Sequence, residues 1–294
     1  MGSLIPGRGS PGTSRSFTLI LGGGGARGFA HLGVLRALEH HGLHPEAVVG
    51  VSMGAVVGAT YAMRDDWYRA VLAMELPRFP GRSEPASEKS VGRVGSIRRS
   101  VAALRTAAAM LFDWGPGARA REAGLAELRK LVGPARLERA RIPVVVTATD
   151  LRSGRRVELR TGDAVEAMYA SGALAGVLPP LERGEQLLAD GAYVDLAPVD
   201  IARELAPPVV IAVDAGQSTG APGIRNGFQA IMRAMDICHR KHAQLRFAQA
   251  DLVLRPIFAR DISVLEFGAV RECVAAGIRI VRAEIETIRR VLAP

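Results

Sequence analysis

Short apolar runs alternate with longer amphipathic stretches along most of the chain. The runs Phe17–Leu21 and Ala47–Val51 carry no charge and lead into glycine or serine, which is typical of buried strands. A helical pattern follows each of them, over residues 26–41 and 53–63. Gly42 stands where glycine commonly ends a helix. The chain therefore opens with two strand–helix units.

The same alternation continues through the middle of the chain. A helix that starts near residue 121 is stopped by Gly133 and Pro134. Beyond it, the pattern predicts strands over residues 142–150, 155–160 and 208–214, a short strand and turn within 186–195, and a helix over 163–171. The segment 155–160 is the expected hairpin partner of 142–150. Strands that alternate with helices predict an α/β fold: one open, mostly parallel sheet with helices on both faces.

Two long helices are predicted near the C-terminal end. In the first, a stripe recurs at steps of three and four residues with charges elsewhere, and its members are Phe228, Ile231, Met235, Cys238, His242 and Leu245. The second helix covers residues 267–292. Cys238 and Cys273 lie in these helical patterns without metal-ligand or redox spacing. We therefore expect buried structural thiols in a reducing compartment.

The amino-acid composition indicates a packed core and a basic surface. The chain has 294 residues, 48% of them hydrophobic, and a formal net charge of +9. Nearly all of the positive charge is arginine, since lysine occurs only at Lys89, Lys130 and Lys241. A basic surface can face nucleic acid, anionic lipid or neither. We expect no nucleic-acid partner, and the oligomeric state stays open.

Three segments bear on domain organisation and location. Residues 1–16 are rich in Gly, Ser, Pro and Arg, lack the apolar stretch of a signal peptide, and predict a disordered tail. The uncharged run over 47–63 is interrupted by glycines and is short for a membrane span. We therefore expect a cytoplasmic protein with a single domain over 17–294. Residues 77–120 form a basic insertion with an apolar piece, which three interpretations fit: a lid, a peripheral contact with an anionic inner-membrane surface, or a plain solvated insertion.

A run of glycines follows the first predicted strand. Four glycines at 22–25 precede Arg27 and Gly28, and such a cluster can cradle a phosphate or direct N–H groups at an oxyanion. The spacing also matches a dinucleotide-binding loop. That interpretation needs an acidic residue at the end of the next strand, where this chain has Ser52. No Lys-Ser/Thr pair follows the glycines, so a Walker phosphate loop is not matched either.

The second strand ends in a candidate nucleophile. Residues 50–54 read GVSMG, a G-x-S-x-G motif between a strand and a helix, which is the context of a nucleophile elbow. Gly50 and Gly54 leave room for the tight turn, and Met53 begins the helix. The alternative is a buried packing turn rich in small residues. Together with the glycine run, the motif favours an oxyanion hole beside Ser52.

A serine nucleophile needs a base, and the histidines are poorly placed to provide one. None of the six follows a predicted strand in the way that an α/β-hydrolase triad requires: His31, His40, His41, His44, His239 and His242. A carboxylate remains, and Asp190 lies at the end of a predicted strand, followed by Gly191. An aspartate before glycine is usually only a turn former.

Three motifs in order give that aspartate more weight. GGGGARG, GVSMG and DGA, with AHLGVLRALE and SGALAGVLPPLERGEQLLADGAYVDLAPVD around them, resemble the patatin-like phospholipase family over residues 17–213. The resemblance implies a three-layer patatin-like fold and a Ser–Asp dyad, with Ser52 as nucleophile and Asp190 as proton acceptor. It also implies an oxyanion hole at Gly23, Gly24 and Gly25, with Arg27 either holding that loop or meeting a lipid phosphate.

The resemblance further implies hydrolysis of lipid or phospholipid carboxylic esters without a metal or cofactor. Two positions depart from the family pattern. Ala175 stands where a proline is common, and Asp195 begins a stretch where asparagines often precede Pro-Val. A different class stays open beside the hydrolase: a catalytically weak lipid-binding or regulatory module with the same fold.

Overall fold

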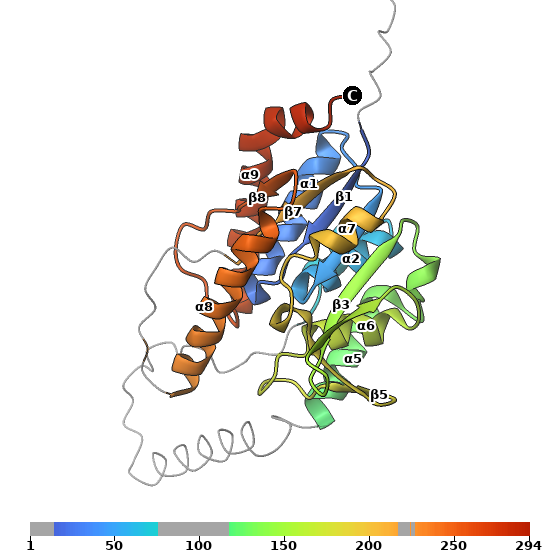
Figure 1. The fold of residues 1–294 in the computed structure, drawn as a ribbon, viewed down its shortest axis with the longest axis vertical. Coiled ribbons are helices and arrows are strands. Elements are labelled where there is room, and N and C mark those ends of the chain that lie inside the picture. The colour runs from blue at the N-terminus through green and yellow to red at the C-terminus, as the bar shows by residue number, and fades with distance from the viewer. Residues whose placement is uncertain (1–14, 76–117, 217–223, 225–226) are drawn as a thin grey trace, which may run out of the picture.

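The computed structural model describes residues 15–75, 118–216, 224 and 227–294. Within them, eight strands form one sheet with helices on both faces (Figure 1). The strands are β1 (Phe17–Leu21), β2 (Ala47–Val51), β3 (Val144–Asp150), β4 (Arg155–Leu159), β5 (Leu181–Arg183), β6 (Gln186–Asp190), β7 (Val209–Val213) and β8 (Leu252–Leu254). The α-helices are α1 (Ala30–His40), α2 (Met53–Met63), α3 (Trp67–Leu72), α5 (Ala118–Val132), α6 (Ala164–Gly172), α7 (Val199–Glu204), α8 (Gly227–Phe247) and α9 (Val270–Val291). The predicted tail before residue 15 and residues 77–117 of the predicted insertion lie outside this part of the chain.

The sheet is parallel on one side and antiparallel on the other. Its order is β5-β6-β3-β2-β1-β7-β8, with β4 paired to β3. The strands from β3 through β2, β1 and β7 to β8 are parallel, whereas β4 and β6 run antiparallel to β3, and β5 to β6. The mostly parallel α/β sheet expected from the sequence is thus confirmed, with an antiparallel edge added by short strands.

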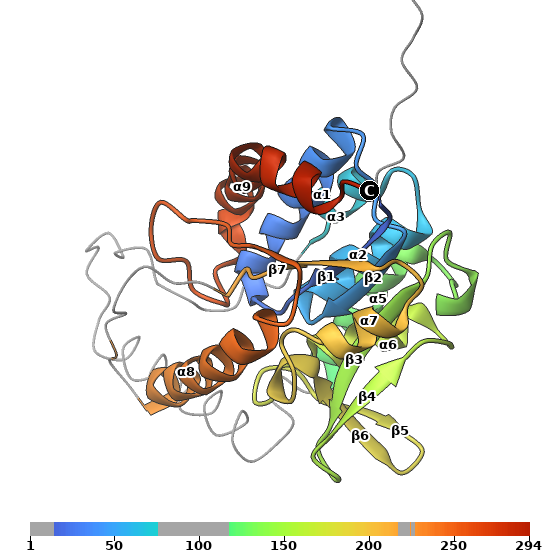
Figure 2. The same cartoon turned by 45° about the horizontal axis from the view of Figure 1, so that its top comes forward.

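Alternate residues of the central strands enter two different cores. On one face, Leu19 and Val48 belong to a large cluster with residues of α1, α2, α6 and α9. On the other face, Ile20 and Val49 pack with residues of α7 and the C-terminal end of α8, in a smaller cluster. Figure 2 shows α1 and α9 on one side of the central strands and α7 and α8 on the other. Such two-sided burial explains why the strands are uncharged runs rather than alternating ones.

Strand register brings the two motif residues together. Val51, the last residue of β2, pairs with Thr147 of β3, and the next residue of β3, Ala148, pairs with Asp190 at the end of β6. Because Ser52 follows Val51 directly, Ser52 and Asp190 meet above the same stretch of β3. The sheet therefore joins positions that are 138 residues apart in sequence.

Besides the short helices α3 and α7, which were not predicted, the structure differs from the sequence-based expectations in four local features. The helix expected from residue 26 begins as a 3-10 turn, Gly25–Phe29, and becomes α-helical only at Ala30, because Gly25 has a positive φ of 55°. The short strands β5 and β8 were not predicted, since three residues are too few for a periodic signal. Cys273 is buried as expected, but Cys238 is exposed, so the prediction of a buried thiol there is wrong.

The fourth difference concerns α8. The helix is present, yet its apolar stripe faces outward, with Ile231, Cys238 and Leu245 all exposed. The periodicity gave the helix correctly but not the direction of its apolar face. Among the described helices, none is long and apolar enough to cross a membrane.

Candidate active site

Ser52 lies in a strained turn between β2 and α2. Its φ of 56° and ψ of −125° make it the non-glycine residue with positive φ in the described part of the chain. A side chain in that conformation is unfavourable and persists only where the surrounding structure enforces it. Its backbone N–H donates to the hydroxyl of Ser171 on α6 at 2.8 Å. The turn is therefore held from a second element, as a nucleophile elbow requires.

Close packing around this turn leaves no room for side chains. A Cβ added at Gly54 would lie 2.0 Å from the carbonyl oxygen of Leu21, the last residue of β1. Added Cβ atoms would also come within 2.6 Å or less of neighbouring atoms at three further motif glycines: Gly28, Gly50 and Gly191. At Gly28 the neighbour is the side chain of Met53. Gly50 and Gly54 thus let β2 and β1 pack closely against the turn and the start of α2, and Gly191 lets the turn after β6 pack on Thr147 of β3.

Asp190 is the hydrogen-bond partner of Ser52. The Ser52 hydroxyl donates to Asp190 Oδ2 at 2.7 Å, and Asp190 Oδ1 accepts the N–H of Ala192 at 2.9 Å. Both side chains are buried, at 7% and 5% exposure. Burial raises the pKa of Asp190 to about 6, although the two hydrogen bonds act in the opposite direction.

The glycine loop lies beside this pair. A Cβ at Gly23 would be 3.6 Å from the Cβ of Ser52, so the backbone of the loop approaches the serine closely. Within the described residues, the N–H groups of Gly23 and Gly24 have no hydrogen-bond partner. Gly25 needs its positive φ, and a side chain there would meet the carbonyl oxygen of Val264 at 2.3 Å. Within the described residues the Gly25 N–H is also without a partner, so the loop beside Ser52 offers three uncommitted donors.

His31 holds the start of this loop. Its Nε2–H donates to the carbonyl oxygen of Gly22 at 2.8 Å, and within the described residues its Nδ1 has no partner. Complete burial lowers the pKa of His31 to about 4, so the ring is neutral near pH 7. The histidine therefore contacts the glycine loop and is not hydrogen-bonded to Ser52. No sequence pattern indicated this contact.

Arg27 anchors the other side of the loop. Its side chain is 3% exposed, and its Nη2 lies 3.4 Å from Asp236 Oδ1 on α8. Burial lowers the pKa of this guanidinium, and Asp236 counteracts the effect. Of the two roles expected for Arg27, this ion pair favours holding the loop.

Tyr193 and Ala175 join two further turns near Asp190. The Tyr193 hydroxyl accepts the N–H of Ala175 at 2.7 Å, and burial raises the pKa of that phenol. A proline at position 175 has no N–H to donate, so the departure from the family pattern permits this hydrogen bond. On its other side, the Tyr193 ring lies 5.6 Å from the His239 ring of α8. Next to these contacts, the Thr149 hydroxyl donates a hydrogen bond to the backbone carbonyl oxygen of Asp190 at 2.9 Å.

Asp195, the other departure, is a buried ion-pair centre. Its Oδ2 accepts from Arg156 of β4 at 2.9 Å and from Arg246 of α8 at 2.8 Å, while Oδ1 accepts the N–H of Ala197 at 3.0 Å. Both arginines also pair with Asp200 of α7. The turn that follows Asp190 is thereby fastened to three elements.

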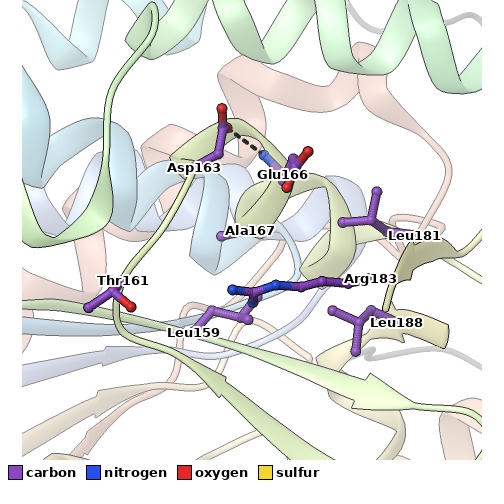
Figure 3. Close-up of a pocket in the computed structure, with 8 residues that line it drawn as sticks. All are labelled: Leu159, Thr161, Asp163, Glu166, Ala167, Leu181, Arg183 and Leu188. Atoms are coloured by element: carbon purple, nitrogen blue, oxygen red, sulfur yellow. Dashed lines mark hydrogen bonds between the residues drawn. The ribbon is translucent and has the colours of Figure 1, made fainter. Parts of the chain in front are cut away.

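Two hollows lie on the described part of the chain, and neither is lined by Ser52 or Asp190. An open hollow of about 450 Å³ is lined by Arg156, Asp195, His242 and Arg246, among others. A smaller one of about 20 Å³ lies between α6 and the antiparallel strands, with the Arg183 side chain drawn across it (Figure 3). The small hollow has room for about one water molecule. Its lining residue Asp163 caps the N-terminus of α6, the opposite end from Ser171.

Comparisons with known proteins identify the family of this chain. A family model described as "Patatin-like phospholipase" matches residues 19–203. An "uncharacterized NTE family protein" of Mycobacterium tuberculosis is 33% identical over 210 residues, which cover 71% of this chain and 52% of that protein. "Lysophospholipase NTE1" of Saccharomyces cerevisiae is 32% identical over 70% of this chain and 11% of that protein.

A crystal structure of VipD from Legionella pneumophila is similar with a TM-score of 0.43, at 13% identity over 92% of this chain and 67% of that one. The chain spans about half the length of the mycobacterial relative and about a tenth of the yeast protein. The family model covers more than half of the chain and includes the glycine loop, Ser52 and Asp190. The chain therefore belongs to the patatin-like phospholipase family.

Proposed function

We propose that this protein is a serine acyl hydrolase that cleaves carboxylic esters of lipids, as a phospholipase A, lysophospholipase or esterase. Ser52 is the nucleophile, Asp190 is its base, and the N–H groups of the glycine loop form the oxyanion hole. The family supports lipid ester hydrolysis, and the yeast relative carries the name lysophospholipase. The observation that carries the assignment of residues is the 2.7 Å hydrogen bond from the Ser52 hydroxyl to Asp190.

In the acylation step, Ser52 Oγ attacks the ester carbonyl carbon while its proton moves to Asp190 Oδ2. The carbonyl oxygen becomes an oxyanion, and the N–H groups of the glycine loop beside Ser52 would receive it. When the carbon–oxygen bond to the leaving group breaks, the proton passes from Asp190 to the departing alkoxide. The alcohol leaves, and the acyl group stays on Ser52.

In the deacylation step, water takes the place of the alcohol. Asp190 removes a proton as the water oxygen attacks the acyl carbon, and the same proton returns to Ser52 Oγ when the fatty acid leaves. A base with a pKa of about 6 is ionised near pH 7 and binds a proton more strongly than an ordinary aspartate does. Burial thus supports the use of one carboxylate in both steps.

A fluorophosphonate probe tests the nucleophile. We expect stoichiometric labelling of the native protein at Ser52 and none in Ser52→Ala, with hydrolysis of a soluble p-nitrophenyl ester lost in parallel. Ser153→Ala serves as the control, because Ser153 is an exposed serine in the β3–β4 hairpin. A folded wild-type protein that takes up no label and hydrolyses neither the soluble ester nor a lysophospholipid contradicts the proposal.

One observation favours the second candidate, a lipid-binding module with weak activity. Ser52 and Asp190 are almost fully covered, at 7% and 5% exposure, so an ester reaches them only if neighbouring residues move. For such a module we expect lipid binding that is unchanged in Ser52→Ala and labelling that is slow even at high probe concentration. Fast labelling that depends on Asp190 excludes the module.

A further inference from the structure

The helix α8 is amphipathic, but its apolar face is turned toward solvent rather than toward the core. Ile231, Ile237 and Leu245 are 54%, 47% and 71% exposed. Ala234 and Cys238 are exposed between them, and Ala230 is exposed just before Ile231. A surface helix normally turns such residues toward the core. Figures 1 and 2 show α8 running along the outside of the molecule, away from the sheet over most of its length.

Apart from Lys241, the charged residues of α8 that pair with other elements face the protein. Asp236 pairs with the buried Arg27, and also with Arg233 and Arg240 of its own helix. At the C-terminal end of the helix, Arg246 pairs with the buried Asp195. Rolling the apolar stripe inward would break both contacts with buried partners, which is costly because each leaves a desolvated charge without its counterion. The orientation of α8 is therefore fixed by its ion pairs.

The outward face carries a cation and no carboxylate. Asp236, the acidic residue of α8, is turned toward Arg27, whereas Lys241 is exposed among the apolar residues. An apolar face with a basic residue on it matches the surface of an anionic bilayer, where apolar side chains enter the acyl boundary and lysine meets the headgroups. On a second copy of the same face, Lys241 would find no carboxylate partner, because Asp236 is turned inward.

We propose that the outward face of α8, defined by Ile231, Ile237, Cys238, Lys241 and Leu245, is the surface with which this protein docks on an anionic lipid bilayer. The proposal rests on the proposed function, since a lipid ester is delivered from such a surface. The helix also borders the Ser52–Asp190 pair, because the His239 ring on its inner side lies against Tyr193, three residues after Asp190. Docking through α8 would hold the pair next to its substrate.

The test uses the full chain with Ser52→Ala, so that binding is measured without turnover. We expect this protein to co-sediment with vesicles of phosphatidylcholine and phosphatidylglycerol. Replacing Ile231, Ile237 and Leu245 together by serine should weaken the partition by roughly tenfold or more, because each apolar side chain contributes to insertion. Lys241→Glu should weaken it selectively on the anionic vesicles. The matched control is Leu72→Ser with Leu151→Ser, two apolar residues of 43% and 42% exposure outside α8.

Soluble-ester hydrolysis separates this proposal from the proposed function. With Ser52 intact, the variant in which serine replaces Ile231, Ile237 and Leu245 should hydrolyse a soluble ester at the wild-type rate. It should hydrolyse vesicle lipid more slowly than the wild type. Vesicle binding that is equal in the triple variant and the control overturns the docking surface. If the wild type is a dimer, the triple variant is a monomer and vesicle binding is unchanged, the face is the contact with a second copy instead. If the wild-type protein hydrolyses no ester but still binds vesicles through α8, only the proposed hydrolase function is overturned.

Discussion

Asp190 and Asp195 lie five residues apart and are equally buried, at 5% and 3% exposure, yet their surroundings are opposite. Asp190 accepts hydrogen bonds from the neutral groups Ser52 Oγ and the Ala192 N–H. Asp195 accepts from two guanidinium groups, Arg156 and Arg246. Burial without a cation raises the pKa of Asp190 to about 6.

The difference indicates which carboxylate can exchange a proton. A buried carboxylate that is held by two guanidinium groups serves as an anchor. A buried carboxylate with only neutral donors holds its charge weakly and accepts a proton readily, which suits a general base. Within one turn, the chain thus separates the candidate base from the residue that positions it.

The largest expected effect is on turnover in Asp190→Asn. The amide keeps the shape of the side chain but cannot take the serine proton, and the loss of a general base commonly lowers kcat by about 10²–10⁴. The variant should be folded and at least as stable as the wild type at pH 8, because it removes a desolvated charge that lacks a counterion. Steady-state kinetics with a soluble ester and urea unfolding measure the two effects. Asp65→Asn is the control, since Asp65 is 95% exposed; kcat retained in Asp190→Asn contradicts the assignment.

Asp195→Asn should lower the stability of the fold more than it lowers turnover. It leaves Arg156 and Arg246 without their buried counterion, and breaking a buried pair of this kind costs about 3–5 kcal/mol of folding free energy. We expect a clear loss of stability in urea unfolding and a smaller loss of kcat than in Asp190→Asn. Asp200→Asn is the matched control, because Asp200 shares both arginines but is 45% exposed, and it should cost about 1 kcal/mol or less. Equal stability of Asp195→Asn and the wild type would remove the distinction between the two aspartates.

The pH dependence of stability distinguishes the same two sites. The folded pKa of Asp190, about 6, lies above its unfolded value of about 3.9, so the folded state binds the proton more tightly between these values. Asp190 therefore lowers the free energy of unfolding as pH rises from about 4 to 6, by no more than about 3 kcal/mol. Asp200 acts in the other direction: its arginine partners lower its pKa to about 2, and its contribution is lost as pH falls from about 4 toward 2.

The difference in unfolding free energy between the wild type and Asp190→Asn, measured in urea from pH 4 to pH 8, isolates the first contribution. A difference that does not change with pH would place the pKa of Asp190 at its ordinary value. In the wild type, kcat/KM should rise with pH through about 6 as Asp190 ionises.

The sequence predicted the parts of this molecule that depend on short-range patterns. The strands β1, β2 and β7 and the helix α2 were given by apolar runs and their glycine boundaries, and the α/β class followed from their alternation. Ser52 and Asp190 were selected as candidates because each lies at the end of a strand in a recognisable motif. Their catalytic roles remain predictions.

Long-range partners could not be predicted in this way. The arginines that bind Asp195 come from 39 residues before it and 51 residues after it, and neither lies in a motif. The outward face of α8 follows from its ion pairs with Arg27 and Asp195, which the periodicity of the helix does not contain. His31 was considered as a base because of its residue type, whereas its contact with Gly22 depends on how α1 meets the glycine loop.

The smallest expected effect comes from the histidines, and it tests whether Asp190 acts without one. His31→Gln keeps an N–H near the Gly22 carbonyl and should leave kcat within a few-fold of the wild type. His31→Leu removes that donor, and the net value of one hydrogen bond, about 1 kcal/mol, predicts a loss of kcat of about tenfold or less. His239→Ala should alter kcat little, because its ring contacts Tyr193 and not Ser52. Circular dichroism and soluble-ester kinetics on all three variants provide the measurement. If a folded histidine variant loses turnover by about 10² or more while Asp190→Asn retains it, the proton goes to histidine, and Asp190 is then an anchor of the same kind as Asp195.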